Sequence, residues 1–134
     1  MTLSFADRTA ITDLIARHGH LVDAGELDRM HELFTADITY DLTDFGRGLV
    51  EGLAALHDLA LATGDANPVG HHITNTVLTE IADNQVHARS KGISITANGT
   101  CGSVTYEDTV VRGTEGWRIN HRKIVAHRAP LGAK

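Results

Sequence analysis

The spacing of the apolar residues changes from a helical period to a two-residue alternation near residue 70, and this change constrains the fold more than any other feature. Before it, helical stripes predict three helices, and one short alternating segment predicts a strand. After it, alternation continues to residue 128 and predicts strands. Helices first and long strands afterwards are typical of an α+β fold.

The three predicted helices span residues 4–23, 27–34 and 50–64, and the strand between the second and third spans residues 37–43. In the first helix Ile11, Leu14 and Ile15 share one face, and Ser4 is placed as its cap. Gly64 ends the third helix. We expect the apolar faces of these helices to pack on one face of a sheet.

The strands after residue 70 form a meander, because turn signals separate them at "ADNQ", "NGTCG" and "GTEG". They span residues 71–81, 86–97, 103–112 and 117–128. Consecutive strands joined by short turns pair in an antiparallel sheet. We therefore predict one α+β domain over residues 1–134, with helices on one face of a curved, mainly antiparallel sheet.

The amino-acid composition and net charge limit the kinds of molecule that the chain is expected to bind. Aromatic residues make up 4% of the chain, so no platform for stacking nucleic-acid bases is evident. The net charge is −5, and the basic residues are scattered except for a cluster within residues 118–128. This charge argues against a phosphate backbone as partner, and we expect no nucleic acid.

The same sequence predicts a cytoplasmic protein that does not enter membranes. Its one cysteine, Cys101, cannot form an internal disulfide, and "MTLSFADR" has neither a basic nor an apolar leader region. No apolar run approaches the roughly 18 residues that span a bilayer.

Three segments carry a resemblance to a known family: "AITDLIARHGHLVDAGELDRMHELF", "HHITN" and "GWRINHRKI". With the order of helices and strands, they resemble the SnoaL-like, scytalone dehydratase-like branch of the nuclear-transport-factor-like superfamily. This resemblance covers nearly the whole chain and implies a cone-shaped fold that encloses a pocket. The superfamily includes ketosteroid isomerase, dehydratases, a dehydrochlorinase and polyketide cyclases.

The resemblance also implies site residues. Scytalone dehydratase and the dehydrochlorinase pair an aspartate at the end of the first helix with a histidine at the start of a strand. These positions fall on Asp23 and His71, with His71 as a base and Asp23 as the group that orients it. An arginine that would stabilise a departing anion falls on Arg122. Val22 stands where scytalone dehydratase has a tyrosine, so one hydroxyl donor of that enzyme is missing.

The chemistry of the residues agrees with these roles. Neutral imidazole accepts a proton near neutral pH, and general-base help typically contributes about 10²–10⁴-fold to a rate. Alternation sends His71 and His72 to opposite faces, and we predict that His71 faces the cavity. By the same parity Asn75 lies on the face of His71, where it could bind a substrate oxygen. Tyr40 could be a phenolic donor.

Structural interpretations of the same residues remain open. Asp23 could cap the helix that follows, or pair with His20 three residues before it on the same helix. His71 could be a core histidine or the wall of a pocket that only binds. His18 is expected to be half-buried, and a surface position for Arg122 is as consistent with the sequence as a pocket position.

The nine histidines do not predict a metal site. The rings of "HGH" on a helix point about 200° apart, and those of "HH" on a strand point to opposite faces. Neither pair presents two ligands to one ion. We expect neither a metal nor a cofactor.

Together these features predict a cofactor-independent lyase or isomerase that acts on a small, mostly apolar cyclic molecule, with dehydration as the first choice. The alternatives are a polyketide cyclase that uses the same two residues, and a noncatalytic ligand-binding or assembly subunit like the small subunits of ring-hydroxylating dioxygenases. We also expect a homo-oligomer, a dimer or trimer, because the outer sheet face carries Ile93, Ile95 and Val111.

Overall fold

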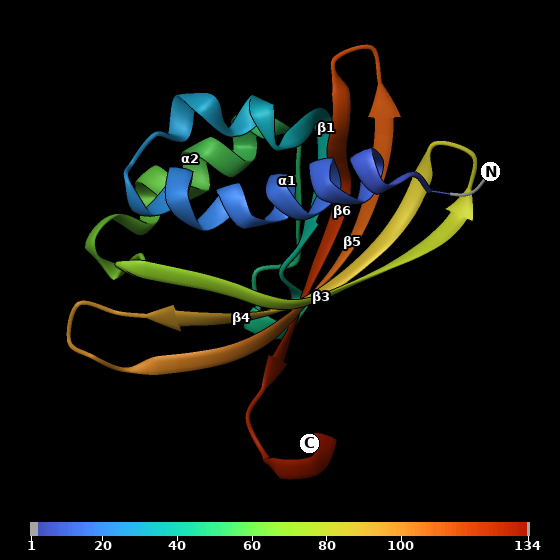
Figure 1. The fold of residues 1–134 in the computed structure, drawn as a ribbon. Coiled ribbons are helices and arrows are strands. Elements are labelled where there is room, and N and C mark those ends of the chain that lie inside the picture. The colour runs from blue at the N-terminus through green and yellow to red at the C-terminus, as the bar shows by residue number, and fades with distance from the viewer. Residues whose placement is uncertain (1–2, 134) are drawn as a thin grey trace.

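Residues 3–133 are described by a computed structural model, in which helices cover one face of a curved six-stranded sheet (Figure 1). The helices are α1 (Phe5–Asp23) and α2 (Leu53–Thr63). The strands are β1 (Phe34–Asp41), β2 (Leu49–Glu51), β3 (Gly70–Ala82), β4 (Gln85–Ile95), β5 (Cys101–Gly113) and β6 (Gly116–His127). Short 3-10 helices lie at η1 (Leu27–Glu32), η2 (Thr43–Phe45), η3 (Gly64–Ala66) and η4 (Pro130–Gly132).

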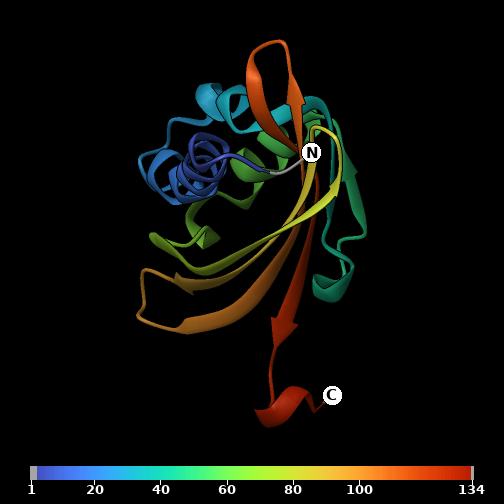
Figure 2. The same ribbon diagram turned by 45° about the vertical axis from the view of Figure 1, so that its right-hand side comes forward.

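The strands lie in the order β2-β1-β6-β5-β4-β3. Every neighbouring pair is antiparallel except β1 and β6, which run parallel. Figure 2 shows α1 and α2 on the same side of the sheet, inside its curve. The predicted α+β architecture and the meander of β3 to β6 are confirmed.

The core fills the space between the helices and the concave face of the sheet. It is built from the apolar stripe of α1, the inward residues of β1 and the alternate residues of β4, β5 and β6, and its most buried members include Ile11, Ile15, Leu33, Phe34, Ile38, Val86, Val110 and Ile119. The Ser4 side chain accepts a hydrogen bond from the backbone N–H of Asp7, as predicted for the cap of α1.

A bulge in β3 changes which of its residues face inward. His71 pairs with Ser94 and Thr74 with Lys91, but the next pair joins Val77 to Arg89, so β3 holds one residue more than β4 there. Asn75 lies in this bulge with a φ of 57°, in the left-handed region. Alternation is therefore interrupted between residues 74 and 77.

The sequence placed two helix boundaries wrongly and missed one strand. The second helix was predicted to end at Phe34, but η1 ends at Glu32 and Phe34 begins β1. Leu33, between the two elements, is buried. Val50 belongs to the short strand β2, which the sequence did not predict, and α2 begins at Leu53. The spacing of apolar residues in runs this short does not distinguish a helical turn from a buried strand.

Candidate active site

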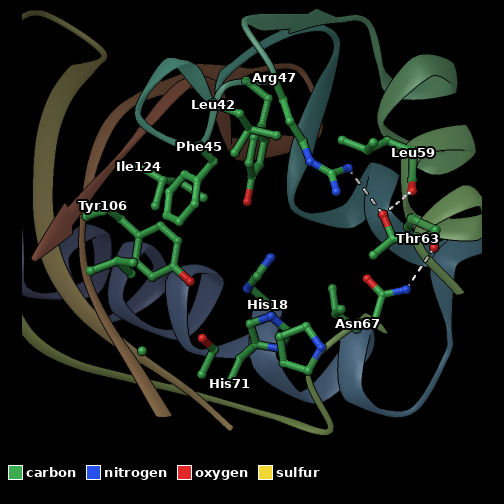
Figure 3. Close-up of a pocket in the computed structure, with 18 of the residues that line it drawn as sticks. His18, Leu42, Phe45, Arg47, Leu59, Thr63, Asn67, His71, Tyr106 and Ile124 are labelled. Atoms are coloured by element: carbon green, nitrogen blue, oxygen red, sulfur yellow. Dashed lines mark hydrogen bonds between the residues drawn. The ribbon is translucent and has the colours of Figure 1, made fainter. Parts of the chain in front are cut away.

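A pocket of about 400 Å³ opens between the helices and the concave face of the sheet (Figure 3). Its walls are mainly apolar, and they include Val22, Leu42, Leu56, Leu59 and Ile124. A few polar side chains project between them, as is usual for a site that binds a small organic molecule.

Asp23 and His71 meet at the wall of this pocket. Asp23 is the last residue of α1, and His71 is the second residue of β3. Asp23 Oδ1 lies 2.6 Å from Nδ1 of the His71 ring, and Asp23 Oδ2 accepts a hydrogen bond of 2.9 Å from the His71 backbone N–H. The carboxylate is thus held at two points on one residue.

This geometry selects one tautomer of the His71 ring. The Asp23 carboxylate accepts a hydrogen bond from Nδ1–H, so the neutral ring carries its proton on Nδ1 and leaves Nε2 bare. His71 lines the pocket and His72 does not, which agrees with the position that the family resemblance implied for His71. The His71 side chain is 13% exposed, which leaves Nε2 as a proton acceptor for a bound molecule.

Gly19 allows α1 to approach β3 closely enough for this contact. A Cβ atom at residue 19 would lie 2.5 Å from the backbone oxygen of His71, well inside van der Waals contact. Gly19 is one turn before Asp23, so the same close approach brings the end of α1 to the start of β3. A larger residue at position 19 must push these two elements apart.

We expect Gly19→Ala to destabilise the protein by about 1–3 kcal/mol, the usual cost of overpacking. Helix propensity alone has the opposite sign, since alanine is favoured over glycine inside a helix by about 1 kcal/mol. Urea denaturation of both proteins measures the difference. Gly113→Ala is the control, because a Cβ there meets nothing within 4 Å. A Gly19→Ala protein as stable as its parent would contradict this packing.

His18 lies beside the pair on the same helix. It lines the pocket, is only 5% exposed, and its ring packs edge-on to that of His71 with centroids 5.4 Å apart. Its Nδ1 atom is buried and has no hydrogen-bond partner among the described residues. Burial, then the positive charge of Arg122, then His71, lower the pKa of His18 well below the ordinary value. His18 is therefore a neutral imidazole at physiological pH.

Two tyrosines supply hydroxyl groups to the pocket. Tyr40 of β1 and Tyr106 of β5 both line it, and Figure 3 shows the Tyr106 hydroxyl directed into the cavity toward His18 and His71. Burial raises the pKa of both phenols, and for Tyr106 the neighbouring Tyr40 adds to this shift. Both hydroxyls stay protonated and can donate to an oxygen of a bound molecule.

Arg122 lies beneath the tyrosines, not in the pocket. Its side chain has no exposed surface and donates two hydrogen bonds, of 2.7 and 2.9 Å, to the equally buried Asp108. Its guanidinium carbon lies 4.3 Å from the Tyr106 ring centroid and 5.5 Å from that of Phe34. Burial opposes the charge of Arg122, but Asp108 outweighs it and raises the pKa of Arg122.

The predicted position of Asn75 is wrong. Asn75 does not line this pocket but a second depression on the outer face of the sheet, together with Val77, Arg89 and Thr105. The parity argument fails because the bulge in β3 interrupts the alternation.

Arg122 lies neither at the surface nor in the pocket, the two positions that the sequence left open. Its buried guanidinium is therefore not placed to contact a departing anion.

Residues 4–123 match the family model of the SnoaL-like domain. The chain belongs to the SnoaL-like domain family. This confirms the resemblance on which the expected fold rested, and the family includes isomerases, dehydratases and cyclases. The search of curated proteins finds no match.

Solved structures agree on the fold of this SnoaL-like domain. A protein of unknown function with a cystatin-like fold from Nostoc punctiforme is 20% identical, with a TM-score of 0.81, 98% of this chain covered and 99% of that one. A candidate aromatic ring hydroxylase from Novosphingobium aromaticivorans is 24% identical (TM-score 0.79, coverage 96% and 94%). A candidate scytalone dehydratase from the same organism is 20% identical (TM-score 0.76, coverage 96% and 95%).

The structure decides between the open interpretations of Asp23 in this SnoaL-like domain. Glu26, not Asp23, precedes the 3-10 helix η1, and η1 has no side-chain cap. Both carboxylate oxygens of Asp23 contact His71, and His20 is exposed to solvent. Asp23 is therefore neither a cap nor the partner of His20.

Sequence reasoning did not single out the pocket residues Tyr106, Arg47 and Arg128. His18 is fully buried rather than half-buried. Alternation could have found Tyr106, because Val104 and Asp108 flank it on the inward face of β5. Nothing in the local pattern marks Arg47, which lies in a loop.

The neutral His18 predicts a pH dependence of stability. An unfolded histidine takes up a proton below about pH 6.5, whereas folded His18 does not, so acid favours the unfolded state. Between pH 7.5 and 5.5 this linkage removes about 1.4 kcal/mol of stability. Urea titrations should show that lowering the pH from 7.5 to 5.5 destabilises His18→Gln by about 1.4 kcal/mol less than it destabilises the parent. His20→Gln, at an exposed histidine two residues away, should keep the full loss, and an identical loss in His18→Gln would refute the assignment.

Residues 3–133 contain no group of three or more His, Cys, Asp or Glu side chains that could hold a metal ion. Within the same residues, no helix is long and apolar enough to cross a membrane.

Proposed function

We propose that this SnoaL-like domain is a cofactor-independent lyase of the dehydratase type that acts on a small, mostly apolar cyclic molecule. The observation that carries the proposal is the Asp23–His71 contact at the wall of an apolar pocket, which leaves Nε2 of His71 bare. A base fixed in this way can remove a proton from carbon.

The proposed reaction removes water from a carbon framework. Nε2 of His71 takes the proton from the carbon next to a carbonyl group, and the electrons of that C–H bond form the new double bond. The C–O bond of the neighbouring hydroxyl breaks, and the departing oxygen takes the proton held by the His71 imidazolium and leaves as water, which returns the neutral ring. Asp23 stabilises the imidazolium that forms, because its carboxylate already faces Nδ1.

The tyrosines have a defined role in this proposal. Negative charge develops on the carbonyl oxygen as the proton leaves carbon, and hydroxyl donors placed beforehand stabilise it. Tyr106 and Tyr40 keep their protons because burial raises the pKa of both. Their hydroxyls replace the missing donor at residue 22, where this chain has the apolar Val22 in the pocket wall.

Two other functions use the same pocket. A polyketide cyclase would use His71 to form a carbanion that closes a ring instead of expelling water. A noncatalytic subunit would bind a ligand without turnover. The similarity in fold to a candidate aromatic ring hydroxylase is the reason to keep this alternative. Proton removal separates either enzyme from the noncatalytic subunit, and loss of water separates the dehydratase from the cyclase.

Hydrogen–deuterium exchange tests the proposal. In D₂O, the protein should catalyse exchange of the protons next to the carbonyl of bicyclic ketones such as tetralones, followed by NMR, and should dehydrate their β-hydroxy derivatives, followed by the absorbance of the enone. His71→Ala should lose both activities, whereas His72→Ala, the neighbouring histidine outside the pocket, should keep them. Ligand binding without exchange would favour the noncatalytic subunit.

We further propose that the chain assembles with copies of itself in the cytoplasm. Exposed apolar side chains remain on the outer side of the sheet, with Val77 55%, Ile81 54% and Ile93 44% exposed. The free Cys101 is exposed and suits a reducing compartment. Light scattering at micromolar concentration should give at least twice the chain mass of 14.4 kDa. A monomer at that concentration would contradict the assembly.

A further inference from the structure

The charge of the pocket differs in sign from the charge of the chain. The whole chain carries a net charge of −5, yet no Asp or Glu among the described residues lines the pocket. Two arginines, Arg47 and Arg128, do line it. Asp23 reaches the pocket only through its contact with His71, so two permanent positive charges in the lining favour an anionic ligand.

Arg47 is free to bind such a ligand. Within residues 3–133 it forms no ion pair, and its side chain makes one long hydrogen bond, 3.5 Å from Nη1 to the Thr63 hydroxyl. The arginines at residues 29, 112 and 122 each pair with a carboxylate instead. Figure 3 shows the Arg47 guanidinium directed toward Thr63 and Asn67, on the side of the cavity opposite Tyr106.

The loop that carries Arg47 is in contact with the second arginine, Arg128. Gly46 and Gly48 flank Arg47 with φ values of 72° and 67°, which glycine adopts at little cost. Arg128 donates a hydrogen bond of 2.8 Å to the Asp44 backbone oxygen and lies 5.6 Å from the Phe45 ring centroid. Arg128 therefore contacts the loop that carries Arg47.

We propose that the ligand of this pocket is a cyclic carboxylic acid whose carboxylate binds Arg47, with Arg128 adding a second positive charge. The inference rests on the proposed function in one respect, that the pocket takes a small cyclic molecule. The planar guanidinium matches a carboxylate through two parallel hydrogen bonds. The apolar walls hold the ring, so that its reacting carbon lies on the His71 side of the cavity.

Binding of two matched probes tests this assignment. Calorimetric titration with 2-naphthoate and 2-naphthamide compares ligands of the same shape with and without the negative charge. The parent protein should bind the carboxylate at least about tenfold more tightly at low salt, and this preference should shrink as salt is raised. Arg47→Gln should abolish the preference. Arg17→Gln, which removes the same charge from an exposed position of α1 outside the pocket, should retain it.

The test is independent of turnover. His71→Ala should keep the preference for naphthoate even though it is expected to lose proton abstraction, so failure of the proposed reaction leaves this result unchanged. Equal affinity for the two probes, no measurable binding of either at millimolar concentration, or an undiminished preference in Arg47→Gln would each overturn the assignment.

Discussion

Asp23→Asn is expected to lower kcat/KM for proton abstraction by about 10²–10⁴-fold while the protein stays folded. The asparagine oxygen can still accept the hydrogen bond from the backbone N–H of His71, so the local geometry is kept. Its NH₂ group then faces Nδ1 of the ring as a donor, and the proton of the neutral ring moves to Nε2. The base is lost because the atom that should accept the substrate proton already carries one.

Combining substitutions separates a catalytic pair from two independent contributions. His71→Ala should lose about as much activity as Asp23→Asn, and the double variant should be little worse than the more damaged single variant, because residues that act as a unit are not additive. Asp13→Asn changes an exposed carboxylate of the same helix and should leave kcat/KM unchanged. Losses that multiply in the double variant would contradict the idea that Asp23 acts through His71.

Asp108→Asn is expected to destabilise the protein by about 3–5 kcal/mol, the usual result of leaving one partner of a buried ion pair uncompensated. Asp108 and Arg122 have no exposed side-chain surface, so water cannot replace the lost charge. The Arg122 guanidinium also packs against the Tyr106 ring, and its displacement should disturb the pocket wall. Urea denaturation measures the change.

The matching control removes both charges. Asp108→Leu combined with Arg122→Met leaves no buried charge, and it should recover most of the stability lost in Asp108→Asn. This double variant also keeps the test informative if the single variant does not fold. A loss below about 1 kcal/mol for Asp108→Asn would mean that the pair is not buried as described.

The sequence predicted the elements whose pattern is long and local. The stripe of α1 and the alternation of β4 to β6 each extend over many residues, so their faces could be assigned. Asn75 was misplaced because a bulge adds one residue to β3 without a mark in the pattern. The Asp108–Arg122 pair joins two strands through their register, which a single sequence does not contain.

The two residues of the candidate base were found through the family resemblance and not through spacing. Asp23 and His71 are 48 positions apart, and their contact depends on the close approach of α1 to β3 at Gly19. No local pattern reports the distance between a helix and a strand. The two arginines of the pocket, Arg47 and Arg128, were missed for a similar reason, because they line one pocket only when the loop after β1 lies beside the end of β6.

The protonation of the His71 ring tests the central claim most directly. Long-range ¹H–¹⁵N correlation spectra at pH 7.5, assigned by comparison with His71→Ala, report which ring nitrogen carries the proton. The structure predicts a proton on Nδ1 and a bare Nε2 in the parent protein, and the reverse in Asp23→Asn. A parent protein whose neutral His71 ring carries its proton on Nε2 would contradict the account, because that ring has no free atom with which to take a proton from a ligand in the pocket.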